Sequence, residues 1–146
     1  MELIDTAGQE QFKSLTESYY KKADCCLLVY DITKKKSFDE CKDYYNQNIK
    51  DFCKENIKVI LLGNKTDLAD QREVTPEEGA AFAVKNDYIF METSCLKNEN
   101  VADAFETLIE ITNIESKKNN NHRRKTISLK KNTKKEEKSK CICPFF

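Results

Sequence analysis

Blocks of apolar residues and blocks of polar residues alternate along this chain. The mostly apolar runs are residues 2–4, 25–30, 59–63 and 88–91. The three longer runs have no polar residue at alternate positions, which favours strands buried on both faces. Strands of this kind are typical of a parallel sheet covered by helices, so we expect a parallel sheet.

The segments between these runs have the character of helices. Apolar residues recur at helical spacing in segments 11–22, 37–54 and 100–114. Ser37 is placed to cap the second of these helices. A further helix, from residue 75 to about residue 85, is predicted from its start: Thr75 as N-cap, Pro76 at the first helical position and Glu78 three residues later form a capping box.

Strands and helices therefore alternate, which predicts an α/β, doubly wound, mostly parallel sheet. In such sheets, ligands bind at the carboxyl ends of the strands. Polar clusters follow three of the predicted strands, at residues 5–9, 64–67 and 93–95. We therefore expect these three clusters to meet at one rim of the sheet.

Composition limits the class of protein. The chain has 146 residues, enough for one domain, and is 39% hydrophobic and 34% charged. It has no run of about 18 apolar residues that could span a membrane, and its first residues do not have the pattern of a signal peptide. Seven cysteines without a Cys-x-x-Cys pair, five of them among apolar residues, indicate reduced thiols in a cytosolic protein.

The net charge of zero conceals an uneven distribution. Residues 117–140 hold eleven Lys and Arg but two acids, a net charge of +9, so the rest of the chain carries −9. A basic tail on an acidic body suggests an anionic partner, either a membrane or a nucleic acid. The tail has no aromatic residue on which a base could stack, so we predict a membrane and no nucleic acid.

The cluster Asn64-Lys65-Thr66-Asp67 contains groups suited to a guanine base. The Asp67 carboxylate can accept two parallel N–H bonds from guanine, a donor pair that adenine lacks. The Lys65 stem can lie along a flat ring, and Asn64 can bridge two loops. Thr93-Ser94-Cys95 can present backbone N–H groups to a base carbonyl. Each of these clusters, taken singly, is also typical of an ordinary surface loop.

The cluster after the first strand suits a magnesium–phosphate site. Asp5 can hold a metal ion directly or through water, and Gly8 lets the backbone approach an oxyanion. Gln9 can both donate to and accept from a water molecule. The pattern Asp-x-x-Gly, taken alone, also occurs in many ordinary turns.

Together, Asp5-Thr6-Ala7-Gly8-Gln9-Glu10, Asn64-Lys65-Thr66-Asp67 and Glu92-Thr93-Ser94-Cys95 closely resemble the motifs of the Rab family of Ras-like small GTPases. Further matching segments are 14–16, 18–20, 28–33 and 72–74, and the resemblance covers residues 2 to about 112. It implies a P-loop NTPase-like fold and a GTPase that regulates vesicle-mediated membrane traffic. It also implies a location on the cytoplasmic face of intracellular membranes, with cycling through the cytosol.

The resemblance assigns roles to individual residues. Asp5 would help to bind Mg²⁺ through water, Gly8 would donate its N–H to the γ-phosphate, and Gln9 would be the catalytic residue that orients the attacking water. The residues that would bind GTP or GDP are Gly8, Asn64, Lys65, Asp67, Ser94, Cys95 and Leu96. Exchange factors, GTPase-activating proteins and effectors would bind through residues 9–22. Cys95 and Leu96 stand where the family usually has alanine and lysine.

The phosphate-binding motif Gly-x-x-x-x-Gly-Lys-Ser/Thr does not occur in the chain, whose only glycines are Gly8, Gly63 and Gly79. The resemblance places this motif, switch I and a central strand upstream of Met1. We therefore favour a truncated sequence over two alternatives, a split product and a degenerate relative. We also expect a gap between the strands that end at Asp5 and Asp31. Unpaired strand edges at such a gap favour aggregation or incomplete folding. The alternative function is a non-catalytic interaction module without nucleotide.

We expect a partial GTPase domain over residues 1–115 and a disordered basic tail over residues 116–146. Cys143 is fourth from the last residue, as in a prenylation box, and Cys141 with Cys143 forms a Cys-x-Cys pattern typical of double prenylation. A basic segment combined with a lipid meets the two-signal requirement for stable membrane anchoring. The alternative is an unmodified tail.

Overall fold

The structure, a computed structural model, describes residues 2–6, 13–123 and 140–144. Its strands are β1 (Glu2–Thr6), β2 (Cys25–Asp31), β3 (Lys58–Asn64), β4 (Ile89–Thr93) and β5 (Lys140–Pro144). They form one sheet in the order β1-β5-β2-β3-β4, and every neighbouring pair is parallel. The predicted α/β class with a parallel sheet is confirmed.

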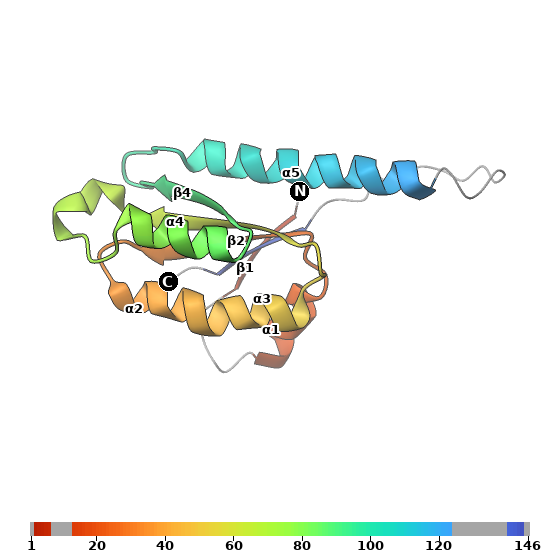
Figure 1. Cartoon of the computed structure of the whole chain (residues 1–146), viewed down its shortest axis with the longest axis horizontal. Helices are drawn as coiled ribbons and strands as arrows, with labels where there is room; N and C mark the ends of the chain where they lie inside the picture. Colours follow the sequence, from red (N-terminus) through yellow and green to blue (C-terminus); the bar gives the residue numbers. More distant parts are fainter. Residues whose placement is uncertain (1, 7–12, 124–139, 145–146) are drawn as a thin grey trace.

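Helices cover both faces of this sheet (Figure 1). They are α1 (Lys13–Tyr20), α2 (Lys35–Glu40), the π-helical η2 (Cys41–Tyr45), α3 (Asn46–Phe52), the 3-10 helix η3 (Thr66–Gln71), α4 (Pro76–Lys85) and α5 (Val101–Arg123). Helix α5 lies on one face, and α1 to α4 contribute buried side chains to the core on the other. Among the described residues, no helix is long and apolar enough to cross a membrane.

Strand β2 is buried over its whole length, which explains its unbroken apolar run. Cys26, Leu28 and Tyr30 pack in the core under α2, α3 and α4. The alternate side chains, Cys25 and Leu27 among them, pack in the second core under α5. Because a strand turns successive side chains to opposite faces, β2 contributes to both cores and has no face left for solvent.

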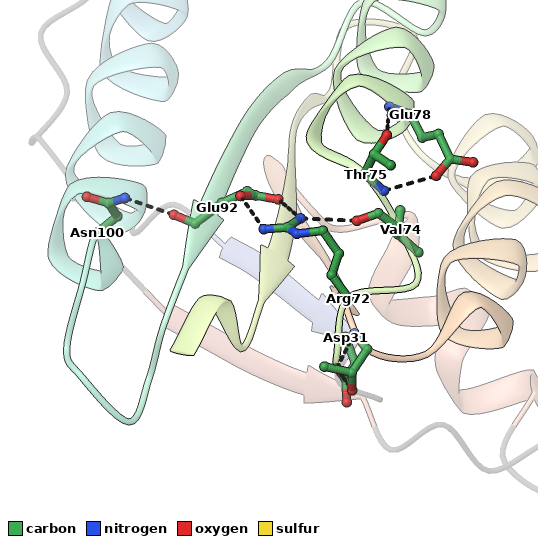
Figure 2. Close-up of polar contacts among 8 residues, drawn as sticks. Asp31, Arg72, Val74, Thr75, Glu78, Glu92 and Asn100 are labelled. Carbon is green, nitrogen blue, oxygen red and sulfur yellow. Dashed lines mark hydrogen bonds and ion pairs between the residues drawn. The ribbon is translucent and has the colours of Figure 1, made fainter. Parts of the chain in front are cut away.

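Two of the predicted helix starts can be compared with the structure. The capping box of α4 is present: Thr75 Oγ1 accepts from the Glu78 N–H (3.2 Å), and Glu78 Oε2 accepts from the Thr75 N–H (3.0 Å) (Figure 2). The cap predicted at Ser37 is wrong, because α2 begins at Lys35. Ser37 instead lies inside the helix, where its Oγ accepts from the Asp31 N–H (3.0 Å) and ties α2 to the end of β2.

Two parts of the predicted tail belong to described elements. Helix α5 continues to Arg123, so it runs well past the predicted boundary at residue 115. Residues 140–144 form strand β5, while the stretch between these two elements lies outside the described residues. The Cys-Ile-Cys run is short and apolar, which suits a buried strand as well as a lipidation motif.

Strand β5 also corrects the prediction of a gap in the sheet. It lies between β1 and β2, so that Cys141 is in register with Leu3 on one side and with Cys25 on the other. The facing edges of β1 and β2 are therefore both paired in the described structure. A parallel strand can be supplied from any point of the chain whose connection is long enough, which residue order alone does not reveal.

Leu108 tests how much of the stability comes from packing α5 on the sheet. Its side chain is fully buried, so we expect Leu108→Ala to lower the free energy of unfolding by about 2–5 kcal/mol. Leu96→Ala removes the same atoms from a side chain that is 84% exposed and should change it by less than about 0.5 kcal/mol. Urea unfolding of the two variants measures this difference, and equal losses would contradict the described position of α5.

Candidate functional site

The loops that follow β3 and β4 meet at the carboxyl edge of the sheet. Asn64 and Thr93 are the last register pair of these two strands. Asn64 Oδ1 lies 3.4 Å from Thr93 Oγ1 and 3.4 Å from the backbone nitrogen of Cys95, so the asparagine bridges the two loops. Two of the three predicted polar clusters, 64–67 and 93–95, thus form one continuous site.

Ser94 is the buried anchor of this site. Its hydroxyl donates to Asp67 Oδ1 (2.5 Å) and accepts from the Lys97 N–H (3.1 Å). Its backbone exchanges two hydrogen bonds with Glu99 (3.1 and 2.9 Å), which close the turn between them. Because the Ser94 side chain is fully buried and bonded on both sides, it holds the Asp67 carboxylate in one orientation.

Asp67 itself is half-buried at the surface of the site. Its Oδ2 has no hydrogen bond to any residue in the described part of the chain, and Oδ1 keeps a second lone pair beside its bond to Ser94. A carboxylate that is fixed on one side and open on the other is suited to accept a pair of N–H groups from a ligand.

Lys65 spans the rim from β3 to the end of β2. Its backbone adopts the left-handed conformation (φ 71°), which is uncommon for residues other than glycine, asparagine and aspartate. Its Nζ lies 2.7 Å from Oδ2 of Asp31, a side chain only 3% exposed. The long carbon stem of Lys65 is therefore held across the edge of the sheet.

The charge of Asp31 depends on these contacts. Burial alone favours the neutral acid, but the Lys65 ammonium and two hydrogen bonds from Thr33 (2.9 and 2.7 Å) hold the pKa of the Asp31 carboxyl below its usual range. Sequence reasoning matched the segment around Asp31 but gave this residue no role. The partner that decides its charge is 34 positions away along the chain.

Arg72 secures the loop that runs from the site to α4 (Figure 2). Its guanidinium donates to both carboxylate oxygens of Glu92 (2.6 and 3.0 Å) and to the carbonyl of Val74 (3.0 Å). These hydrogen bonds with Glu92 raise the pKa of Arg72 above its usual value. Asn100 Nδ2 donates to the Glu92 carbonyl (2.9 Å), so strand β4, the start of α5 and this loop are joined at one point.

Other predicted site residues are less completely placed. Leu96 follows Cys95 on the rim, but its side chain is 84% exposed. Asp5 lies in β1, whose carboxyl end is at the same edge of the sheet as the carboxyl ends of β3 and β4. The Asp5 side chain lies outside the described part of the structure, and so do Gly8 and Gln9. Within the described ranges, no three His, Cys, Asp or Glu side chains are grouped closely enough to hold a metal ion.

Comparison with known proteins agrees with this geometry. A sequence model described as the Ras family matches residues 1–114. The chain belongs to the Ras family. Among its relatives are Ras-related protein Rab11D of Nicotiana tabacum, 44% identical over 119 residues (81% of this chain, 53% of that protein), and Ras-related protein RABA5a of Arabidopsis thaliana, 46% identical over 118 residues (80% and 53%).

A third relative, GTP-binding protein ypt3 of Schizosaccharomyces pombe, is 43% identical over 108 residues (74% of this chain and 50% of that protein). The resemblance to Rab proteins found in the sequence is thus confirmed. This Ras-family chain spans about half the length of the curated relatives it matches.

One small cavity lies beside the rim in the described part of the chain. A cavity of about 50 Å³ lies beside Asn64 and Thr93 and is lined mainly by apolar side chains such as Leu62 and Phe105. Pockets that enclose small ligands have volumes of about 300–1,000 Å³. This cavity is therefore too small to enclose a ligand of that kind.

The substitution Lys65→Met tests whether Lys65 keeps the Asp31 carboxyl charged. Without the ammonium, burial should raise the Asp31 pKa, and the free energy of unfolding should fall by about 1–3 kcal/mol at pH 7. In the unsubstituted chain, the pKa of Asp31 is lower in the folded state than in the unfolded state. The ion pair therefore stabilises the fold fully above the unfolded-state pKa of about 3.9, and this stabilisation is lost as the pH falls through the folded-state pKa.

The difference between the two proteins should therefore shrink below about pH 4. Urea unfolding at pH 7 and at lower pH, with an NMR titration of the Asp31 carboxyl, measures both effects. Lys36→Met is the control, because the Lys36 side chain is 90% exposed and pairs with Glu40. An equal loss of stability at every pH would contradict the role given to this ion pair.

Proposed function

We propose that this chain is the C-terminal part of a Rab-like small GTPase, which binds GTP and GDP and, as a whole protein, hydrolyses GTP and regulates vesicle-mediated membrane traffic. Membership of the Ras family and the names of the Rab relatives support this proposal. The structural observation that supports it best is the half-buried carboxylate of Asp67, one oxygen of which is held by the Ser94 hydroxyl.

Guanine recognition follows from the chemistry of these groups. Asp67 accepts hydrogen bonds from N1–H and the 2-amino group of guanine, while the stem of Lys65 lies along the ring. Adenine would leave the Asp67 carboxylate unpaired in a partly desolvated position, which costs affinity. Asn64 joins the loops, and Ser94, Cys95 and Leu96 provide backbone N–H groups for the base carbonyl.

The phosphate end of the site is proposed from the resemblance alone. Asp5 helps to hold Mg²⁺ through water, Gly8 donates its N–H to the γ-phosphate, and Gln9 orients the attacking water. Mg²⁺, when bound, neutralises charge on the phosphate oxygens. Residues 9–22 contact exchange factors, GTPase-activating proteins and effectors.

A second candidate function is an interaction module that does not bind nucleotide. The observation in its favour is that the 146 residues hold no Gly-x-x-x-x-Gly-Lys-Ser/Thr motif to surround the β- and γ-phosphates. Nucleotide affinity distinguishes the two candidates, because a module of this kind has no need of one.

Binding of fluorescently labelled GTP and ATP to the full chain, with Mg²⁺, tests the first candidate. We expect preference for GTP, and Asp67→Ala should weaken GTP binding by about 100-fold, because two hydrogen bonds to a charged group are lost. Asp70→Ala is the matched control, since Asp70 is exposed in the same helix η3. Equal affinity for ATP would contradict guanine recognition, whereas a folded chain that binds neither nucleotide would favour the second candidate.

The tail completes the proposal. We infer that Cys141 and Cys143 are prenylated and that the basic residues of 117–140 add attraction to anionic lipids on the cytoplasmic face of intracellular membranes. The anchor rather than a helix within the described structure would then hold the protein to the membrane.

Vesicle sedimentation tests this anchor. After incubation with a prenyltransferase extract and geranylgeranyl diphosphate, the chain should bind anionic vesicles, and binding should weaken at high salt because the basic residues are screened. The double variant Cys141→Ser and Cys143→Ser should stay in the supernatant. Cys95→Ser, which removes an exposed cysteine elsewhere, should bind like the unsubstituted chain.

A further inference from the structure

We propose that Arg72 and Glu92 are positioning residues for the base end of the site: their ion pair holds the loop that carries Asp67 and so sets the direction of the Asp67 carboxylate. This inference rests on the proposed function, because it assigns the pair to the guanine contact of Asp67. Three features of the structure support it: the irregularity of helix η3, the two-bond geometry of the pair, and the contacts that hold Glu92.

Helix η3, which carries Asp67, is irregular. Leu68 has non-helical backbone angles (φ −102°, ψ 34°), so η3 consists of two short turns rather than one continuous helix. Hydrogen bonds in 3-10 turns have poor geometry, and long runs of such turns are uncommon. None of the six residues of η3, all of them described, is buried. Neither its backbone nor packing in a core therefore fixes the position of Asp67.

Side-chain hydrogen bonds hold η3 near both of its ends. Near the first end, the Ser94 hydroxyl donates to Asp67 Oδ1 (2.5 Å). Directly after the last residue, Arg72 donates to Glu92 Oε1 (2.6 Å) and Oε2 (3.0 Å). Glu92 and Ser94 are two positions apart in the sequence, so both ends of η3 are joined to the same short segment at the end of β4.

The geometry of the Arg72–Glu92 pair is suited to holding a position. A guanidinium that donates to both oxygens of one carboxylate fixes direction as well as distance. The two side chains are 19% and 22% exposed, so water and salt screen this pair less than a pair on the open surface. Arg72 also donates to the Val74 carbonyl (3.0 Å), which fixes the guanidinium within its own loop.

Glu92 is held by regular elements rather than by another loop. It lies in β4 and is in register with Gly63 of β3. Its carbonyl accepts from Asn100 Nδ2 (2.9 Å), and the Asn100 carbonyl accepts from the N–H of Ala104 in α5 (3.1 Å) (Figure 2). The pair thus connects the loop of Asp67 to two strands and a helix, and groups held on rigid elements keep a more precise geometry.

Loss of the pair would leave Asp67 held by Ser94 alone. The carboxylate would then sample more orientations and would match the two N–H groups of guanine for less of the time. A less preorganised site binds more weakly, and the difference appears mainly as faster release of the ligand. Preference for guanine over adenine would fall as well, although Arg72 and Glu92 act through Asp67 and need not touch the base.

Hydrogen exchange of the full chain without nucleotide tests the effect on the loops. In Arg72→Met, the Lys97 and Glu99 amides, both bonded to Ser94, should exchange about tenfold faster, because hydrogen bonds to a charged group are lost nearby. Amides of β2 and β3 should change less than in Leu108→Ala, which weakens the packing of α5 on the sheet. Unchanged loop exchange in Arg72→Met would overturn the inference.

Dissociation of fluorescently labelled GTP and ATP measures the effect on the base. In Arg72→Met and in Glu92→Gln, GTP should be released about tenfold faster, and the preference for GTP over ATP should fall by about the same factor. Arg72→Lys, which keeps the charge but not the two parallel hydrogen bonds, should give an intermediate value. Leu108→Ala lowers stability alone and should keep the preference.

A double-mutant cycle distinguishes positioning from a general structural role. Because Arg72 acts through Asp67, Arg72→Met should weaken GTP binding by less than about twofold in a chain that already carries Asp67→Ala. Full additivity of the two substitutions, or an unchanged GTP preference in Arg72→Met, would overturn the positioning role. Failure of the unsubstituted chain to bind either nucleotide would contradict the proposed function instead, and the exchange measurement would still decide whether the pair positions the loops.

Discussion

A parallel strand that is buried on both faces places demands on everything around it. Strand β2 is fully buried, so its backbone groups need a strand on each side and its side chains need helices above and below. Strand β3 supplies one neighbour, and the helices on the two faces of the sheet supply two of the other three requirements. The fourth, a neighbour on the far side of β2, is supplied from the other end of the chain by β5.

The same parallel arrangement creates the candidate site. Since all described strands run in one direction, the loops after β3 and β4 leave the sheet at the same edge. Buried polar contacts then remove the freedom that such loops would otherwise have. Ser94 orients Asp67, Asp31 holds Lys65, and the Arg72–Glu92 pair fixes the loop beyond them. These contacts therefore preorganise the loops of the site.

The two halves of the sheet differ in how firmly they are joined. Strands β2, β3 and β4 are paired along most of their lengths, whereas β5 meets β2 at two register positions. The candidate site is built on the firmly paired half, and the two tail cysteines lie in β5.

Local patterns in the sequence were sufficient for the elements whose partners are near in the chain. The capping box of α4, the buried run of β2 and the meeting of loops 64–67 and 93–95 all depend on spacing or on the rule for parallel sheets. Family membership followed from motifs of the same kind. The 3-10 helix η3 was missed, because its polar residues have no apolar period.

Contacts between distant residues were decided only by the tertiary structure. The Lys65–Asp31 and Arg72–Glu92 ion pairs could not be predicted from the sequence around either partner. A charged residue in a loop has many potential partners. The place of β5 is the clearest case, because the Cys-Ile-Cys run is equally consistent with a lipid motif and a strand. In the described structure this run pairs with both β1 and β2, a contact between distant parts of the chain that its local sequence does not specify.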